Sequence, residues 1–229
     1  MSTPPLPPPK SPRWMYLHGF ASGPDSTKGV AVAKHYAGQG LHVERLNLRV
    51  PSMEQLHVSA MLDTVSAALG GPEERAVLFG SSLGGLVASR VAEQDARVCA
   101  LVLLAPAFRV VEQLHRRMGD AAWAHWQKAG WIETDDFAEK RKVRIHSGFI
   151  PDAETVDART GGWPDVRVPT LIIHGRTDDT CNIHYSRQWA EGRRHMRLVE
   201  VDDGHELTAS LPRILAESDD FLRPWGARR

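Results

Sequence analysis

The sequence has few cysteines and no excess charge of either sign, and each absence excludes a class of function. Its two cysteines, Cys99 and Cys181, are too few for a disulfide framework or a cysteine-based zinc site. Lys and Arg total 28, and so do Asp and Glu. No basic excess is therefore available to bind phosphates or an anionic membrane surface, and we expect no nucleic-acid partner.

Long apolar runs and metal-binding patterns are also missing. Runs such as Val98–Ala105 are far shorter than the roughly 20 residues that a membrane-spanning helix needs, so we expect no membrane span. The 11 histidines are scattered, and none forms the pair with glutamate that is typical of a helical zinc site. The sequence thus predicts no bound metal and gives no sign of another cofactor.

Residues 1–12 are rich in proline and contain no apolar segment of the kind found in secretory signals. Proline fixes the backbone φ angle and removes the N–H that a sheet would use. We predict a disordered, polyproline-like tail over these residues, followed by a single domain over 13–229. With no export signal recognised, we expect the protein to be cytoplasmic.

After the tail, apolar runs of strand length alternate with segments of helical periodicity. This alternation is typical of an α/β fold with a mainly parallel sheet flanked by helices. Several of the runs are almost continuously apolar, as strands covered on both faces are. The six expected strands are 13–18, 41–48, 75–79, 98–104, 170–174 and 196–201.

Helices are expected between these strands. Ser52 and Gln55 form a capping-box pattern ahead of an apolar stripe over 58–69. Two further helices are predicted over 82–94 and 211–222, the second closing the domain. The sequence therefore indicates regular strand–helix units over most of its length.

One connection between predicted strands is too long for this alternation of strands and helices. About sixty residues separate Leu104 from Thr170, far more than an ordinary strand–helix connection contains. Within it, 109–130 is predicted to be helical. Three apolar residues mark one face of that helix: Val111, Leu114 and Met118. We interpret about 107–167 as a helical cap, inserted after the fourth strand and lying over the carboxyl edge of the sheet.

The segment 80–84 reads G-S-S-L-G and matches the G-x-S-x-G motif between a predicted strand and a predicted helix. The flanking glycines allow a tight turn that lifts the Ser82 hydroxyl clear of the sheet. Taken alone, the motif is equally consistent with a small-residue turn that lets the helix pack closely. In this context we predict that Ser82 is a nucleophile and that Ser81 points elsewhere.

A serine nucleophile needs a base, and the base needs an orienting acid. His205 lies in a glycine-containing loop after the last expected strand, and Asp178 lies after the strand before it. Asp179 is the better candidate for a simple helix cap. The order Ser82, Asp178, His205 is the one expected of the α/β-hydrolase fold, so we predict these three residues as the triad.

A tetrahedral intermediate needs two N–H donors aimed at its oxyanion. The N–H of Leu83 follows the nucleophile, and the loop after the first strand supplies the N–H of Phe20. His18 and His174 each precede a glycine at a strand end, and we expect packing and hydrogen-bonding roles for both. Cys181 lies near the acid loop without a basic neighbour, so we expect it to be inert.

These motifs resemble a known family. The segments 16–20 (YLHGF), 26–28 (STK) and 79–85 (FGSSLGG) are similar to those of YqiA-type bacterial esterases and of the small mammalian α/β-hydrolase that removes acyl groups from protein thioesters. The likeness covers roughly residues 14–224 and implies the same triad and oxyanion donors. The chain departs from larger relatives by lacking their first two strands, and Cys181-Asn182 stands where Val-Pro is common.

The predicted activity is hydrolysis of a small carboxylic ester or thioester through an acyl-Ser82 intermediate. The same triad also fits amide or carbon–carbon bond hydrolysis or perhydrolysis, and a non-catalytic binding module is the alternative from another class. Six aromatic residues in the cap are candidates for an acyl pocket, with the cap's own core as the equal alternative. They are Trp123, Trp126, Trp131, Phe137, Phe149 and Trp163. The sequence does not set the oligomeric state.

Overall fold

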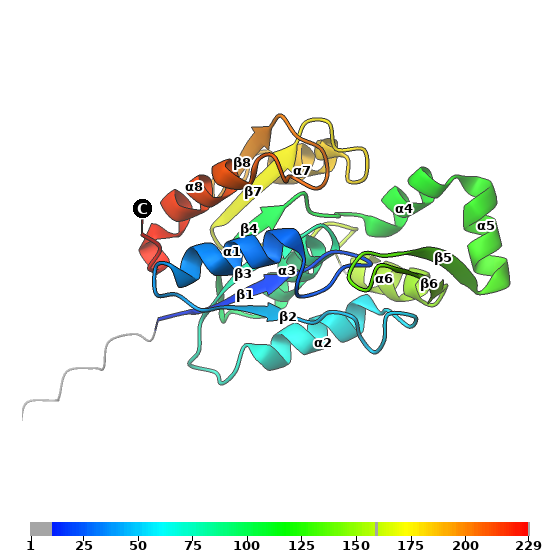
Figure 1. Cartoon of the computed structure of the whole chain (residues 1–229), viewed down its shortest axis with the longest axis horizontal. Helices are drawn as coiled ribbons and strands as arrows, with labels where there is room; N and C mark the ends of the chain where they lie inside the picture. Colours follow the sequence, from blue (N-terminus) through cyan, green and yellow to red (C-terminus); the bar gives the residue numbers. More distant parts are fainter. Residues whose placement is uncertain (1–10, 159, 229) are drawn as a thin grey trace, which may run out of the picture.

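A parallel sheet forms the centre of the protein in the computed structural model, which describes residues 11–158 and 160–228 (Figure 1). The predicted tail lies outside the described residues except for its last two. The sheet has six strands in the order β2-β1-β3-β4-β7-β8, all parallel. These are β1 (Arg13–Leu17), β2 (Val43–Leu46), β3 (Ala76–Ser81), β4 (Val98–Leu104), β7 (Thr170–Gly175) and β8 (Met196–Val201). All six predicted strands are confirmed.

Helices cover both faces of the sheet. On one face lie α1 (Thr27–Ala37) and α8 (Leu211–Leu222), which continues as the short helix η1 (Arg223–Trp225). On the other lie α2 (Val58–Ala68), α3 (Leu83–Gln94) and α7 (Ile183–Ala190). None of the helices over 11–158 and 160–228 is long and apolar enough to cross a membrane.

The continuously apolar strands are explained by this double cover, because alternate side chains enter opposite cores. In β3, Leu78 shares one core with Met61 of α2. Its neighbour Phe79 packs against Tyr36 of α1 in the other, with ring centroids 5.5 Å apart. The strand is therefore fixed in register from both sides.

The predicted capping box does not begin a helix. The Ser52 hydroxyl does accept a hydrogen bond from the Gln55 N–H at 3.2 Å, but the two residues form a turn before α2. The helix begins at Val58, and its N-cap residue His57 makes no side-chain capping bond. The sequence pattern identified the local hydrogen bond correctly and assigned it to the wrong element.

The insertion between β4 and β7 contains three helices and a hairpin. The helices are α4 (Val110–Met118), α5 (Asp120–Ala129) and α6 (Phe149–Ala158), and the hairpin joins β5 (Trp131–Asp136) to β6 (Arg141–His146). Figure 1 shows them grouped at the right of the view, the side to which β1 and β2 point. The expectation of one helix over 109–130 and of an all-helical cap is corrected here: Gly119, with a φ of 77°, separates α4 from α5, and two strands follow.

Candidate active site

Ser82 lies at a sharp turn between β3 and α3. Its φ of 53° and ψ of −119° are unusual for a residue with a side chain, and its N–H is held by the Leu104 carbonyl at 2.9 Å. A β-carbon at Gly80 would strike the Gly84 backbone, and one at Gly84 would strike the Leu17 carbonyl. The two motif glycines are therefore required by close packing of the turn.

The loops after β7 and β8 bring the other two predicted triad residues to Ser82. His205 Nε2 lies 3.1 Å from the Ser82 hydroxyl oxygen, and His205 Nδ1 lies 2.8 Å from an oxygen of Asp178. The two loops are tied together, because the N–H and hydroxyl of Thr177 both donate to the Asp203 carbonyl at 3.2 and 2.9 Å. The structure thus brings together three residues that are far apart in the sequence.

Asp178 is held as a buried carboxylate. Its side chain is fully buried, and its second oxygen accepts the N–H groups of Thr180 and Cys181 at 2.9 and 2.7 Å. His174, fully buried beneath it, lies 3.2 Å from the same oxygen that meets His205. Burial alone would raise the pKa of Asp178, but hydrogen bonds from His174 and His205 hold it well below its ordinary 3.8.

The charge of Asp178 in turn acts on His205. Burial disfavours the charged imidazole, yet the hydrogen bond to Asp178 and the negative charge there raise the pKa of His205 above its ordinary 6.5. An imidazolium formed when Ser82 gives up its proton is therefore stabilised at this position.

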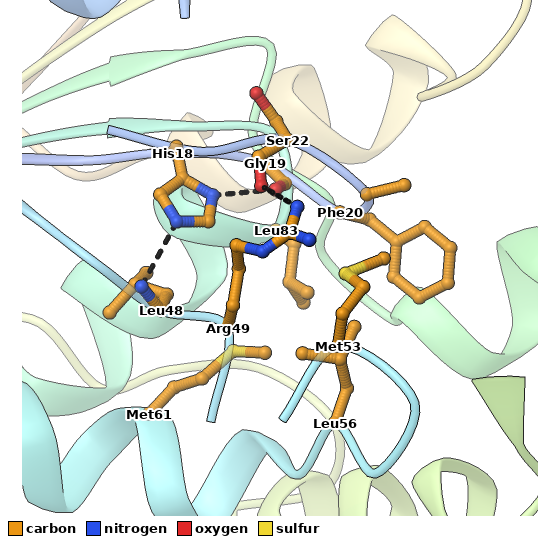
Figure 2. Close-up of a pocket in the computed structure, with 11 residues that line it drawn as sticks. His18, Gly19, Phe20, Ser22, Leu48, Arg49, Met53, Leu56, Met61 and Leu83 are labelled. Carbon is orange, nitrogen blue, oxygen red and sulfur yellow. Dashed lines mark hydrogen bonds between the residues drawn. The ribbon is translucent and has the colours of Figure 1, made fainter. Parts of the chain in front are cut away.

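The loop that carries Phe20 passes directly over Ser82. A β-carbon on Gly19 would lie 3.1 Å from that of Ser82. His18 holds the loop: its Nδ1 lies 2.9 Å from the Gly19 carbonyl, and its Nε2 accepts the Leu48 N–H at 3.0 Å (Figure 2). Burial lowers the pKa of His18, which favours the neutral ring that this pattern needs.

His18 therefore sets the direction of the Phe20 N–H. The Gly19 carbonyl and the Phe20 N–H belong to one peptide unit and point in opposite directions when the bond is trans. Since His18 holds the carbonyl, the N–H is directed away from His18. The N–H of Leu83 belongs to the first turn of α3, where helix N–H groups have no partner within the helix.

Lys28 is a residue for which the sequence suggested no role. It lies in the first turn of α1, with a side chain only 9% exposed, and its Nζ donates to the Glu206 carbonyl at 2.9 Å. It also lies 3.5 Å from the His205 carbonyl. The sequence marked Lys28 only through the STK segment of the family resemblance. Its contact with the His205 loop could not be predicted, because 177 residues separate Lys28 from His205.

Cys181 lies closer to the nucleophile than the sequence indicated. Its thiol is 3.8 Å from the Ser82 hydroxyl oxygen, and the residue is buried. His174 ties this segment down, because its Nε2 is 2.8 Å from the Cys181 carbonyl and its Nδ1 is 2.8 Å from the Ser186 hydroxyl. His174 thus has the hydrogen-bonding role that was expected of it.

Most of the six cap aromatic residues pack within the cap. Trp126 is buried, stacks near Phe149 and donates its indole N–H to the Ile145 carbonyl at 3.0 Å. Trp123 packs edge-on against Trp126. Phe137, in contrast, is 71% exposed and lies in the turn of the hairpin. An exposed ring does not line an enclosed pocket.

The remaining two aromatic residues are half-buried. Trp131 lies under the Arg144 guanidinium, 5.1 Å from the ring centroid, and Trp163 lies beside Phe108. The Phe149 ring packs against the loop over Ser82, with its centroid 5.6 Å from that of Phe20. The structure therefore buries three of the six, Trp123, Trp126 and Phe149, in the hydrophobic core.

A narrow cavity lies between the Phe20 loop and the residues before and within α2 (Figure 2). None of the six cap aromatic residues lines it, and their role in an acyl pocket stays a prediction. Its walls are His18, Gly19, Phe20, Ala21, Ser22, Leu48, Arg49, Met53, Leu56, Met61 and Leu83. The loop over 18–22 and Leu83 thus form one side of the cavity, and α2 with the segment before it forms the other.

Within residues 11–158 and 160–228, no cluster of three or more His, Cys, Asp or Glu side chains is placed to hold a metal ion. The polar side chains around Ser82 instead bond to one another. The arrangement is therefore suited to transferring protons between a hydroxyl, an imidazole and a carboxylate.

Comparison with known proteins places this geometry in context. A family model described as "Uncharacterised protein family (UPF0227)" matches residues 13–218. No curated protein matches the chain. Among solved structures, the alpha/beta hydrolase domain-containing protein 10 from mouse superposes with a TM-score of 0.77 at 22% identity, over 94% of this chain and 91% of that one.

Two bacterial structures are similar to the same extent. Est1E from Butyrivibrio proteoclasticus has a TM-score of 0.73 at 21% identity, over 96% of this chain and 90% of its own. A putative hydrolase from Agrobacterium vitis S4 has a TM-score of 0.75 at 21% identity, over 92% and 88%. Together these superpositions confirm the predicted α/β-hydrolase fold.

Proposed function

Since the chain belongs to the UPF0227 family and has the α/β-hydrolase fold, we propose that it is a serine hydrolase that cleaves a carboxylic ester or thioester. The observation that carries the proposal is the hydrogen-bonded series from Ser82 through His205 to Asp178, with distances of 3.1 and 2.8 Å. Two of the similar structures, from Pyrococcus furiosus and Rhodothermus marinus, are described as an esterase and an esterase domain, which supports the same reaction class.

In the proposed acylation, the Ser82 oxygen attacks the carbonyl carbon while its proton passes to His205 Nε2. The N–H groups of Phe20 and Leu83 stabilise the resulting oxyanion. When the intermediate collapses, the bond to the alcohol or thiol breaks and His205 returns the proton to it. The acyl group then remains on Ser82 as an ester.

Deacylation follows the same path with water as the nucleophile. His205 takes a proton from the water as the water oxygen bonds to the acyl carbon, and it returns the proton to the Ser82 oxygen as the bond between that oxygen and the acyl carbon breaks. The products are a carboxylic acid and the regenerated hydroxyl. Asp178 keeps the imidazole in the tautomer that both half-reactions need.

Hydrolysis of p-nitrophenyl butyrate and of a butyryl thioester by Ser82→Ala tests the proposal. The variant is expected to lose activity by a factor of about 10⁴ to 10⁶, because the nucleophile is gone. Ser81→Ala removes a buried hydroxyl one position away and serves as the matched control, which should remain active. A wild-type protein inactive on both substrates, or a fully active Ser82→Ala, contradicts the proposal.

A further inference from the structure

The cavity beside Phe20 lies on the acyl side of the proposed reaction centre. The leaving group must receive a proton from His205, so it occupies the side on which His205 lies. The cavity is lined by Phe20 and Leu83, the two predicted oxyanion donors, and by no residue of the loops that carry Asp178 and His205. A substrate group that enters it is therefore the acyl group.

The walls of the cavity offer apolar contact and no unpaired charge. Leu48, Leu56 and the two methionines Met53 and Met61 form its lower side in Figure 2, and all four are buried. Both ring nitrogens of His18 are already engaged, one by the Gly19 carbonyl and one by the Leu48 N–H. The histidine has no free nitrogen with which to bind a charged end group.

Arg49 also contributes its side-chain stem and not its charge. The guanidinium makes two bonds to Asp136 of β5, at 2.9 and 2.7 Å, and a third to Glu139 at 2.8 Å. It also lies 3.4 Å from the Ser22 carbonyl. Two carboxylates therefore neutralise it, and a substrate carboxylate gains little there.

The size of the space limits what enters. It is too narrow at present for a water molecule, so a substrate group enters it only if its walls move. Methionine is unbranched and adapts its shape readily. Movement of the Met53 and Met61 side chains is the simplest way to open a channel for one unbranched chain.

We infer that this cavity is the acyl pocket of the enzyme and that it admits a short, unbranched, uncharged acyl chain, with Met53 and Met61 setting the length. The inference rests on the proposed serine hydrolase function. It assigns chain-length selection to the side of the molecule formed by α2, and not to the cap aromatic residues.

The test is kcat/KM for p-nitrophenyl esters from acetate to decanoate, measured on the wild-type protein and on Met53→Ala and Met61→Ala. We expect the wild-type value to fall beyond butyrate and both variants to raise the octanoate-to-butyrate ratio about tenfold, because each removes a wall of the pocket. A monosuccinyl ester should react more slowly than the butyryl ester. Met118→Ala, at a methionine of α4 outside the cavity, is the matched control and should leave the ratio unchanged.

The possible outcomes distinguish a wrong assignment of the acyl pocket from a wrong proposed function. If the wild-type enzyme is active and the ratio is unchanged in both folded variants, or shifts only in Met118→Ala, the assignment of the pocket is overturned. If Met61→Ala fails to fold, as judged by circular dichroism, Met53→Ala decides, because Met53 lies in a loop. A wild-type protein that hydrolyses no ester or thioester overturns the function itself, and the pocket assignment falls with it.

Discussion

His205 is the residue whose charge decides when the proposed reaction runs, because only the neutral imidazole can accept the proton of Ser82. The Asp178 carboxylate, 2.8 Å away, raises the pKa of His205 against the effect of burial. The wild-type kcat/KM is therefore expected to rise with pH, with an apparent pKa above 6.5. A pH profile of kcat/KM on p-nitrophenyl butyrate checks this expectation. A kcat/KM with an apparent pKa at or below 6.5 contradicts it.

Replacing Asp178 with asparagine tests the cause of that shift. The charge that raises the pKa of His205 is removed while burial remains, so the pKa is expected to fall, as an NMR titration of the imidazole would show. Activity should fall by about 10⁴-fold, because the wrong tautomer faces Ser82. Asp179→Asn, at an exposed neighbouring carboxylate, is the control and should change neither quantity.

At the scale of elements, the first turn of α1 holds the loop that carries His205. Lys28 donates to the Glu206 carbonyl and comes near that of His205, so Lys28→Met leaves these carbonyls without the bond. A displacement of about 1 Å at a proposed base costs up to about 100-fold in rate. We expect kcat to fall by about that factor with KM little changed.

Two further variants distinguish positioning by Lys28 from a general loss of stability. Lys28→Arg keeps a donor and should recover part of kcat. Lys34→Met, at an exposed lysine of the same helix, should match the wild-type enzyme. A Lys28→Met protein with unchanged kcat, or one in which only KM changes, would show that the contact does not position the base.

The elements themselves were largely predictable, for a physical reason. Strands buried on both faces are continuously apolar, and that signal located β4 over Val98–Leu104 to the residue. The hairpin in the cap was missed because it is mostly exposed: in β6 only Val143 and Ile145 are buried. The alternation of apolar and polar residues in the hairpin is short and rich in charge. The hairpin contacts the loop after β1 through the Phe137 N–H and the Ala21 carbonyl, and no local sequence pattern reveals that contact.

For the whole molecule, the sequence located the candidate site because parallel strands all end at one edge. The segments holding Phe20, Ser82, Asp178 and His205 each follow a strand of the sheet, so they were expected to meet. The cavity was not predicted, because only one of its sides comes from motif segments; the other comes from α2 and the segment before it, which carry no motif. The catalytic roles of Ser82, Asp178 and His205 stay predictions until activity is measured.

The central claim is that Ser82 is a nucleophile activated by His205, and covalent labelling tests it most directly. The protein is treated with a fluorophosphonate, its intact mass is measured, and the modified peptide is sequenced by mass spectrometry. We predict a single adduct on Ser82, formed as fluoride leaves phosphorus, and none in Ser82→Ala. No adduct on the folded wild-type protein, or one on Ser81 or Cys181 instead, would contradict the claim.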